Sequence, residues 1–142
     1  MNSLLEHISL LTRILGSPVA AVTLAASVPR DDAGDFDYRA LTEELKHQGF
    51  ENYLQERPLR KIPQLALPAV ILLRDGEAAV LKKLSGEEAV VEFAGIGEQR
   101  LATSDLQEQY MGYAWFIKPK AAKDVRSELP EYELPKGWFW RV

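Results

Sequence analysis

The sequence predicts an α+β domain in which helices come first and an antiparallel sheet follows. In the first 48 residues, apolar side chains recur every three or four positions, as they do on one face of a helix. From Phe50 onward, apolar residues instead alternate with polar ones or form short runs between turns that contain glycine or proline. The 142 residues suffice for one domain with a buried core.

Two helices are expected at the start of the chain. Residues 2–15 place their leucines and isoleucines on one face, and Asn2 or Ser3 is suited to cap the helix. Pro18 is typical of the first turn of a second helix.

A third helix is expected to begin at Asp35, which would cap it, and to run to about Gln48. Phe36, Leu41 and Leu45 are spaced to face the interior. These three helices would form one layer of the domain.

The second half of the chain reads as a sheet. Asp75-Gly76 would join two of its strands, because this pair is favoured where both turn residues need positive φ. The strands are expected at residues 50–56, 69–74, 77–84, 88–93 and 113–118, with a proline-rich connection at 58–68 and a short strand and helical turn at 99–109.

The C-terminal stretch differs in composition from the rest. Residues 119–142 contain three prolines and mixed charges, which is typical of an extended linker. The stretch closes on Trp138-Phe139-Trp140-Arg141-Val142, and these aromatic rings either sit at a membrane interface or pack back on the domain. We therefore expect a domain at 1–118 and a linker at 119–142 that leads toward a membrane-spanning region.

Composition excludes several classes of function. The chain has no cysteine, so it has no disulfide, no thiolate metal site and no cysteine nucleophile. The net charge of −4 argues against nucleic-acid binding. The two histidines fall on separate elements, and no metal or cofactor is expected.

The residues around the Asp75-Gly76 turn resemble the catalytic half of the bacteriocin-processing cysteine peptidases, a papain-like family. In that family the turn glycine precedes the catalytic histidine, and the next strand ends in His-Asp-Pro. Here Glu77 follows the turn, and the strand ends in Glu92-Phe93-Ala94. Counting back from Gly16 puts the nucleophile position at Ser3.

Three further segments carry the resemblance, which extends over about residues 3–118. They are Leu67-Pro68-Ala69, Gly97-Glu98-Gln99-Arg100-Leu101 and Tyr110-Met111-Gly112-Tyr113-Ala114. The resemblance implies a papain-like fold with N-terminal helices packed on a C-terminal antiparallel sheet. Degenerate domains of this kind lie at the N-terminus of type I secretion ABC transporters that export RTX toxins and adhesins.

This resemblance implies a place and a set of partners. The domain would lie on the cytoplasmic side of the bacterial inner membrane and would contact unfolded RTX substrate. Its other partners would be the remainder of the transporter, a membrane fusion protein and an outer-membrane channel. ATP binding and hydrolysis would reside in parts of the transporter outside this chain.

The matched positions lack the chemistry of a cysteine peptidase, which needs a thiolate, a base and a group that orients the base. Ser3, Glu77 and Phe93 stand there instead, so we expect a non-catalytic domain. His7 lies one helical turn after Ser3, but a capping role for Ser3 is favoured over a serine–histidine pair. Two rival functions stay open, a serine-dependent leader peptidase and a purely structural assembly domain.

Substrate contacts are expected in one of two places. The first is the former catalytic position, formed by Ser3, Glu77 and Phe93. The second is the basic connection formed by Arg57, Arg60 and Lys61, which either is a solvated loop or docks an acidic partner.

Overall fold

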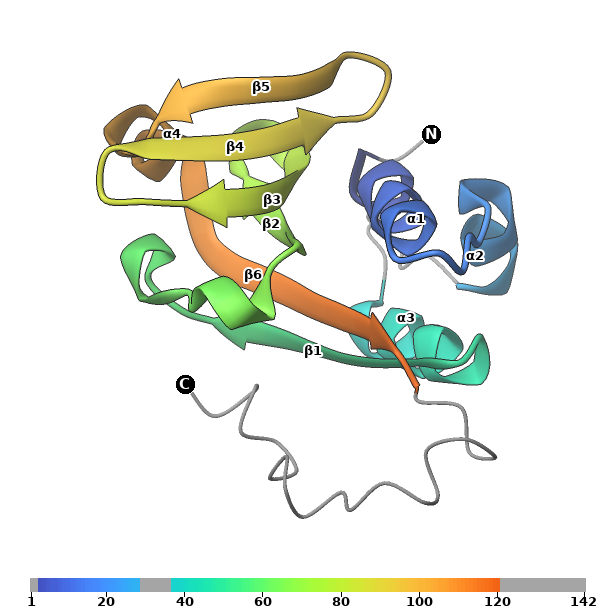
Figure 1. Cartoon of the computed structure of the whole chain (residues 1–142). Helices are drawn as coiled ribbons and strands as arrows, with labels where there is room; N and C mark the ends of the chain where they lie inside the picture. Colours follow the sequence, from blue (N-terminus) through green and yellow to red (C-terminus); the bar gives the residue numbers. More distant parts are fainter. Residues whose placement is uncertain (1–2, 29–36, 121–142) are drawn as a thin grey trace.

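A computed structural model describes residues 3–28 and 37–120 of the chain. Helices and an antiparallel sheet form its two layers, in the chain order that the sequence predicts (Figure 1). The elements are α1 (Ser3–Ile14), α2 (Ala21–Ser27), α3 (Tyr38–His47), β1 (Phe50–Glu56), η1 (Leu59–Lys61), η2 (Gln64–Ala66), β2 (Ala69–Leu73), η3 (Arg74–Gly76), β3 (Ala78–Leu84), β4 (Glu88–Phe93), β5 (Gly97–Ala102), α4 (Thr103–Gln109) and β6 (Tyr110–Pro119), where η marks a single 3-10 turn.

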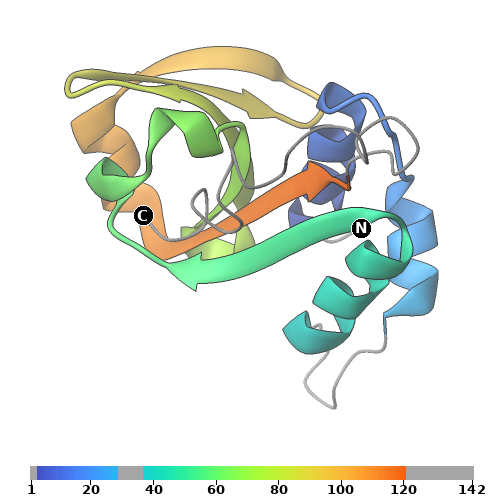
Figure 2. The same ribbon diagram turned by 60° about the horizontal axis from the view of Figure 1, so that its bottom comes forward.

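The sheet has six strands in the order β1-β6-β2-β3-β4-β5. All neighbouring strands are antiparallel. The last strand in sequence, β6, therefore lies between β1 and β2, and β1 forms an outer edge (Figure 2).

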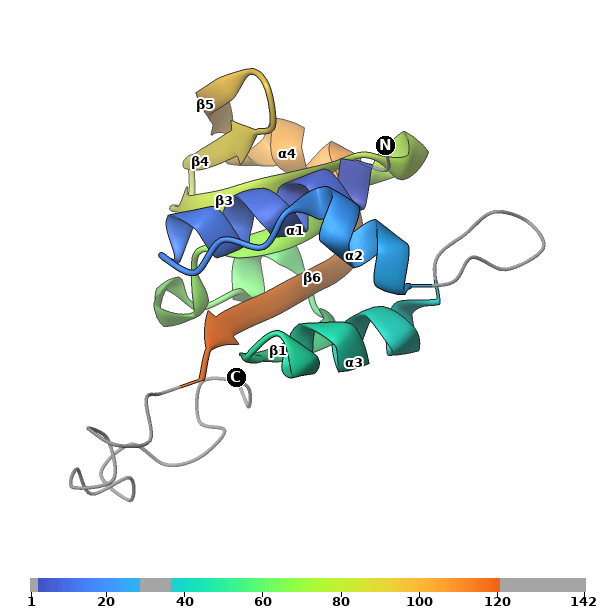
Figure 3. The same cartoon turned by 90° about the vertical axis from the view of Figure 1, so that its right-hand side faces the viewer.

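Each face of the sheet has its own apolar core, because successive side chains of a strand point to opposite faces. On one face, Val70, Val80 and Trp115 pack with residues of α1, α2 and α3 such as Leu5 and Leu41. On the other face, the buried residues include Leu59, Ile71, Leu81, Leu106 and Phe116. Figure 3 shows α1 along the sheet beside β3, with α2 next to it and α3 beside β1.

The helix boundaries differ from two expectations. The second helix begins at Ala21 rather than near Pro18. The reason lies in Val19, whose N–H donates to Thr12 Oγ1 at 3.0 Å and whose carbonyl accepts from Ser9 Oγ at 2.7 Å. Both backbone groups of Val19 are thus held by α1, which keeps the intervening chain out of a helix.

The cap of the third helix is Asp37 and not Asp35. Its carboxylate accepts from the N–H groups of Arg39 at 2.9 Å and Ala40 at 3.3 Å, which are unsatisfied at a helix start. Leu41 and Leu45 are fully buried as expected, whereas Phe36 lies outside the described residues.

The strands confirm the predicted pattern to within a few residues, and β6 is longer than expected at both ends. It begins at Tyr110, directly after α4, and continues through Pro119, which pairs with Phe50. The next N–H, of Lys120, still donates to the Gly49 carbonyl at 2.9 Å. The sheet thus includes Pro119, which the sequence assigned to the linker, and residues 121–142 of that linker lie outside the described residues.

Candidate functional site

The N-terminus of α1 meets the start of β3, and this contact joins two of the predicted site residues. Ser3 Oγ donates to Glu77 Oε1 at 3.3 Å. The turn before Glu77 sets this geometry, because Asp75 and Gly76 both adopt positive φ, at 63° and 74°. The N–H of Leu73 then closes the turn on the Glu77 carbonyl at 2.8 Å.

His7 lies one turn deeper in α1 and is buried, with 4% of its surface exposed. Its Nε2 accepts the Ala94 N–H at 3.0 Å, and its Nδ1 lies 2.7 Å from the Ser3 carbonyl oxygen. These two bonds fit the neutral tautomer that carries its proton on Nδ1, since an amide N–H only donates and a carbonyl only accepts. His7 therefore connects α1 to the residue that follows β4.

The same tautomer prevents His7 from acting as a base toward Ser3. Ser3 Oγ lies 3.4 Å from Nδ1, but that nitrogen already donates its proton to the Ser3 carbonyl. A general base needs a free lone pair aimed at the hydroxyl proton. The spacing of a serine–histidine pair is present here without the arrangement that catalysis needs.

Phe93 fills the third matched position. Its ring packs edge-to-face against the His7 ring, with centroids 6.3 Å apart and planes at 88°. An aromatic hydrocarbon cannot accept a proton or orient an imidazole, so this contact packs the ring and does not activate it. The structure thus places Ser3, Glu77, His7 and Phe93 in one group, which we call the Ser3 cluster.

The Ser3 cluster is held together by hydrogen bonds and a ring contact, and its side chains differ from the thiolate, base and orienting group of a cysteine peptidase. Glu77 is an exposed carboxylate that accepts the hydrogen bond of the Ser3 hydroxyl. A neighbouring cavity of about 660 Å³ opens between α1, the start of α2 and the chain after β4. Its walls include Glu6, Val19 and Ala94 rather than Ser3, Glu77 or Phe93.

The basic connection lies elsewhere. Arg60 donates to the Gly86 carbonyl at 2.9 Å, in the turn at the far end of β3 from Glu77. The seven residues of β3 separate the two places, which corresponds to roughly 20 Å. Arg57 donates to the Lys61 carbonyl at 3.4 Å, and its own carbonyl accepts the Tyr110 hydroxyl at 2.6 Å. The residues predicted to contact substrate therefore lie at two separate sites, the Ser3 cluster and the basic connection.

Sequence reasoning placed His7 near Ser3 but missed its bond to Ala94. The helical spacing of four residues reveals the first contact. The second joins positions 87 residues apart, and no local pattern encodes it.

Other features of the described residues bear on ligand chemistry. In residues 3–28 and 37–120, no group of three or more His, Asp or Glu side chains is placed to hold a metal ion. No helix within these ranges has the length and apolar character needed to cross a membrane. Burial raises the pKa of the Tyr110 hydroxyl well above its usual value, so this group donates to Arg57 as a neutral phenol.

Comparison with known proteins finds similar chains among solved structures. No protein-family model and no curated protein matches the chain. The N-terminal peptidase C39-like domain of a toxin secretion ATP-binding protein from Vibrio parahaemolyticus is similar, with 26% identity, a TM-score of 0.73, and coverage of 84% of this chain and 98% of that one.

Two other solved structures share the fold at 14% identity, each with a TM-score of 0.68 over 84% of this chain. One is a double-glycine-motif protease from an AMS/PCAT transporter, solved in complex with a leader peptide, of which 86% is covered. The other is the peptidase domain of Streptococcus ComA, a bifunctional ABC transporter of a quorum-sensing pathway, of which 93% is covered. The sheet, the helices and these likenesses agree with the resemblance found in the sequence, and the chain has the papain-like fold of the peptidase C39-like domains of ABC transporters.

Proposed function

We propose that this domain is a non-catalytic accessory domain of a type I secretion ABC exporter, and that it recruits or positions unfolded RTX-protein substrate for export. It acts on the cytoplasmic side of the bacterial inner membrane. The ATPase and the translocation path belong to the remainder of the transporter. A membrane fusion protein and an outer-membrane channel complete the export route.

The hydrogen bonds of His7 are the observation that supports a non-catalytic role. Both ring nitrogens of His7 are engaged, one with Ala94 and one with the Ser3 carbonyl. Ser3 has no imidazole partner for proton transfer, and its hydroxyl donates to Glu77 instead. Phe93 stands where a papain-like site needs a group that orients its base.

Two of the similar solved structures support the recruiting role. A similar domain belongs to a toxin secretion ATP-binding protein, and another was solved with a bound leader peptide. A scaffold that holds a peptide for cleavage can hold an extended chain without cutting it. An unfolded partner loses conformational freedom when it docks, so we expect weak and reversible binding, as export requires.

Two rivals make different predictions. A serine-dependent leader peptidase would cut a peptide and lose that activity with Ser3→Ala. A purely structural domain would be required for assembly of the transporter but would bind no substrate in isolation.

Binding can be tested by titrating the isotope-labelled chain with unfolded RTX substrate and, separately, with the calcium-folded form while amide shifts are followed. We expect shifts with the unfolded form and smaller ones with the folded form. Shifts around Ser3, Glu77 and Phe93 would place substrate at the Ser3 cluster, and shifts around Arg60 and Lys61 would place it at the basic connection. No shifts at high concentration of unfolded substrate would refute recruitment and leave the assembly role.

A further inference from the structure

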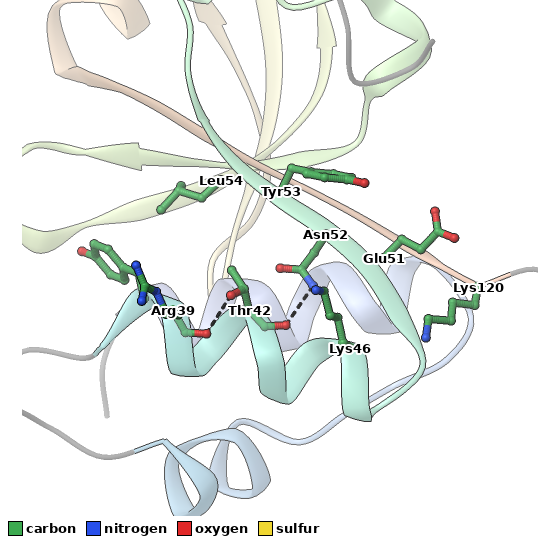
Figure 4. A pocket seen from close by; sticks show the side chains of 9 residues that line it. Arg39, Thr42, Lys46, Glu51, Asn52, Tyr53, Leu54 and Lys120 are labelled. Carbon is green, nitrogen blue, oxygen red and sulfur yellow. Dashed lines mark hydrogen bonds between the residues drawn. The ribbon is translucent and has the colours of Figure 1, made fainter. Parts of the chain in front are cut away.

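A second surface, away from the Ser3 cluster, has the form of a peptide-docking site. A pocket of about 830 Å³ opens between α3 and β1 (Figure 4). Its lining residues come from these two elements and from the residue after β6, and they are Tyr38, Arg39, Thr42, Lys46, Glu51, Asn52, Tyr53, Leu54 and Lys120. We call it the β1-edge pocket.

Among residues 3–28 and 37–120, no strand covers the outer edge of β1. Within these ranges β1 ends the sheet, and its one partner strand is β6. The N–H of Arg57 donates to Gly112, and the N–H of Lys120 donates to Gly49, both at 2.9 Å. Along a strand of an antiparallel pair, every second residue directs its N–H and C=O groups to the partner strand. In β1 these are the odd-numbered residues, which bond to β6. The N–H and C=O groups of Asn52, Leu54 and Glu56 therefore point away from β6. Asn52 is buried, so the groups open to a partner are those of Leu54 and Glu56.

Side-chain bonds hold the pocket between helix and strand in a defined shape. Asn52 is buried, and its Nδ2 donates to the Thr42 carbonyl of α3 at 3.1 Å (Figure 4). Its Oδ1 accepts from Trp115 Nε1 at 2.9 Å. One side chain thus ties α3, β1 and β6 together, and this bond fixes the helix beside the strand edge.

Aromatic rings give the pocket an apolar lining. Tyr38 packs edge-to-face on Trp115, with ring centroids 5.9 Å apart, yet 47% of its surface is exposed. Tyr53 is 45% exposed. Half-exposed tyrosines are typical of surfaces that bind peptides, because they offer a large contact area at low entropic cost.

The charge of the pocket is opposite to that of the whole chain. Arg39, Lys46 and Lys120 line it, with Glu51 as the single acidic residue, although the chain carries a net charge of −4. Lys46 is paired with Glu43 at 3.6 Å. Within the described part of the chain, Arg39 and Lys120 take part in none of the ion pairs. Two cations are therefore available to a partner.

We propose that the β1-edge pocket docks an extended acidic segment of a partner polypeptide, which adds as a strand to β1. The backbone groups of Leu54 and Glu56, which are partly exposed and exposed, supply the hydrogen bonds of strand addition. Arg39 and Lys120 attract carboxylates of the segment, and the tyrosines contact its apolar side chains. This inference goes beyond the proposed function, since it needs neither an RTX partner nor the Ser3 cluster.

A synthetic peptide of about twelve residues, alternating aspartate and valine, is long enough to pair with all of β1 and serves as the probe. Titrated into the labelled full chain, it is expected to shift the amides of Asn52, Leu54 and Glu56. The same peptide with N-methylated central amides cannot form the strand hydrogen bonds, and we expect its binding to weaken by about tenfold. A peptide with lysine in place of aspartate is expected to bind no better than the methylated one.

Charge reversal tests the recognition of acidic side chains. The double variant Arg39→Glu/Lys120→Glu is expected to bind the aspartate peptide about tenfold more weakly, since it turns two attractions into repulsions. The matched double variant Arg13→Glu/Lys83→Glu changes the net charge equally on other surfaces and is expected to bind like the parent. Spectra of the free variants confirm that each is folded.

The inference fails if the aspartate peptide does not bind, if it binds equally after N-methylation, or if both double variants lose affinity alike. Shifts confined to Ser3, Glu77 and Phe93 would also overturn it, while leaving substrate recruitment at the Ser3 cluster intact. Conversely, edge shifts with this probe and no response to unfolded RTX substrate would support the pocket and refute the proposed substrate.

Discussion

Two polar side chains at the start of α1 illustrate how position decides a residue's role. Ser3 is partly exposed and contacts Glu77, whereas His7 is buried and bonded on both ring nitrogens. A nucleophile needs the opposite arrangement, in which the histidine is free to take the serine proton. The Ser3 cluster is thus a set of structural contacts at the positions that match the catalytic residues of the peptidases.

The first prediction concerns cleavage. Incubation of the chain with double-glycine leader peptides should give no products by mass spectrometry, because Ser3 lacks a base. Ser3→Ala should leave that result unchanged. Specific cleavage that disappears in Ser3→Ala would instead establish the serine peptidase.

The second prediction concerns the stability provided by His7. His7→Ala removes the acceptor of the Ala94 N–H and the ring that packs on Phe93. The expected loss is about 1–3 kcal/mol, the usual cost of leaving a polar group without its partner in a partly buried site. Urea denaturation measures it, with the exposed substitution Lys83→Ala as the control. An unchanged midpoint for His7→Ala would show that the bond contributes nothing.

Individual elements owe their placement to contacts at their ends. Asp37 caps α3, the Asp75-Gly76 turn joins β2 to β3, and α1 side chains hold Val19 before α2. Farther along the sheet, Lys82 of β3 forms ion pairs with Glu92 of β4 at 3.3 Å and Glu98 of β5 at 2.9 Å. This lysine links three successive strands through side chains alone.

The Lys82 pairs predict a pH dependence. The hydrogen bond from Lys82 lowers the pKa of Glu98 below its ordinary 4.5, and the bond to Glu98 raises the pKa of Lys82. A carboxyl with a lowered pKa in the folded state stabilises the fold above its unfolded pKa, and that contribution disappears as the pH falls through the folded value. The stability difference between the parent and Lys82→Met should therefore shrink as the pH drops from about 5 to about 3.

Urea midpoints at several pH values measure this difference, and Lys61→Met is the control for losing an exposed positive charge. At high pH the raised pKa of Lys82 has the opposite consequence. The contribution of Lys82 to stability is lost only when a strongly alkaline pH exceeds its pKa in the folded state. A difference that grows on acidification would contradict the assigned pairs.

The molecule as a whole depends on the strand that closes the described chain. β6 lies between β1 and β2 and supplies buried residues to both cores, Trp115 to one and Phe116 to the other. Without it, β1 would lose the strand with which it pairs in the described part of the chain. The sheet is thus completed only when residues 110–119 are available.

This dependence predicts the result of two truncations. A chain ending at Lys120 retains every described element and should give dispersed amide spectra and a cooperative unfolding transition. A chain ending at Gln109 lacks β6, and we expect it not to fold, because both cores lose fully or nearly fully buried aromatic side chains. A folded chain that ends at Gln109 would show that β6 is dispensable.

Local chemistry determined much of this protein from the sequence alone. The change from helical to strand periodicity, the Asp75-Gly76 turn and the caps and breaks of helices act within a few residues, so the elements and the α+β order could be predicted. The resemblance to the bacteriocin-processing peptidases, rather than local chemistry, brought Ser3, Glu77 and Phe93 together as one group. Local chemistry placed the cap of α3 two residues early, because Asp35 and Asp37 are equally good caps by sequence.

Tertiary structure decided the features that join distant parts of the chain. The tautomer of His7 follows from a backbone amide 87 residues away. The pairing of β6 with one side of β1 leaves the other side of β1 as the edge of the described sheet, although residues 50–56 have the sequence of an ordinary strand. Arg39 and Lys120 are far apart in the sequence, yet they line one pocket. Such contacts depend on how elements pack rather than on local propensity, and for that physical reason only the folded molecule reveals them.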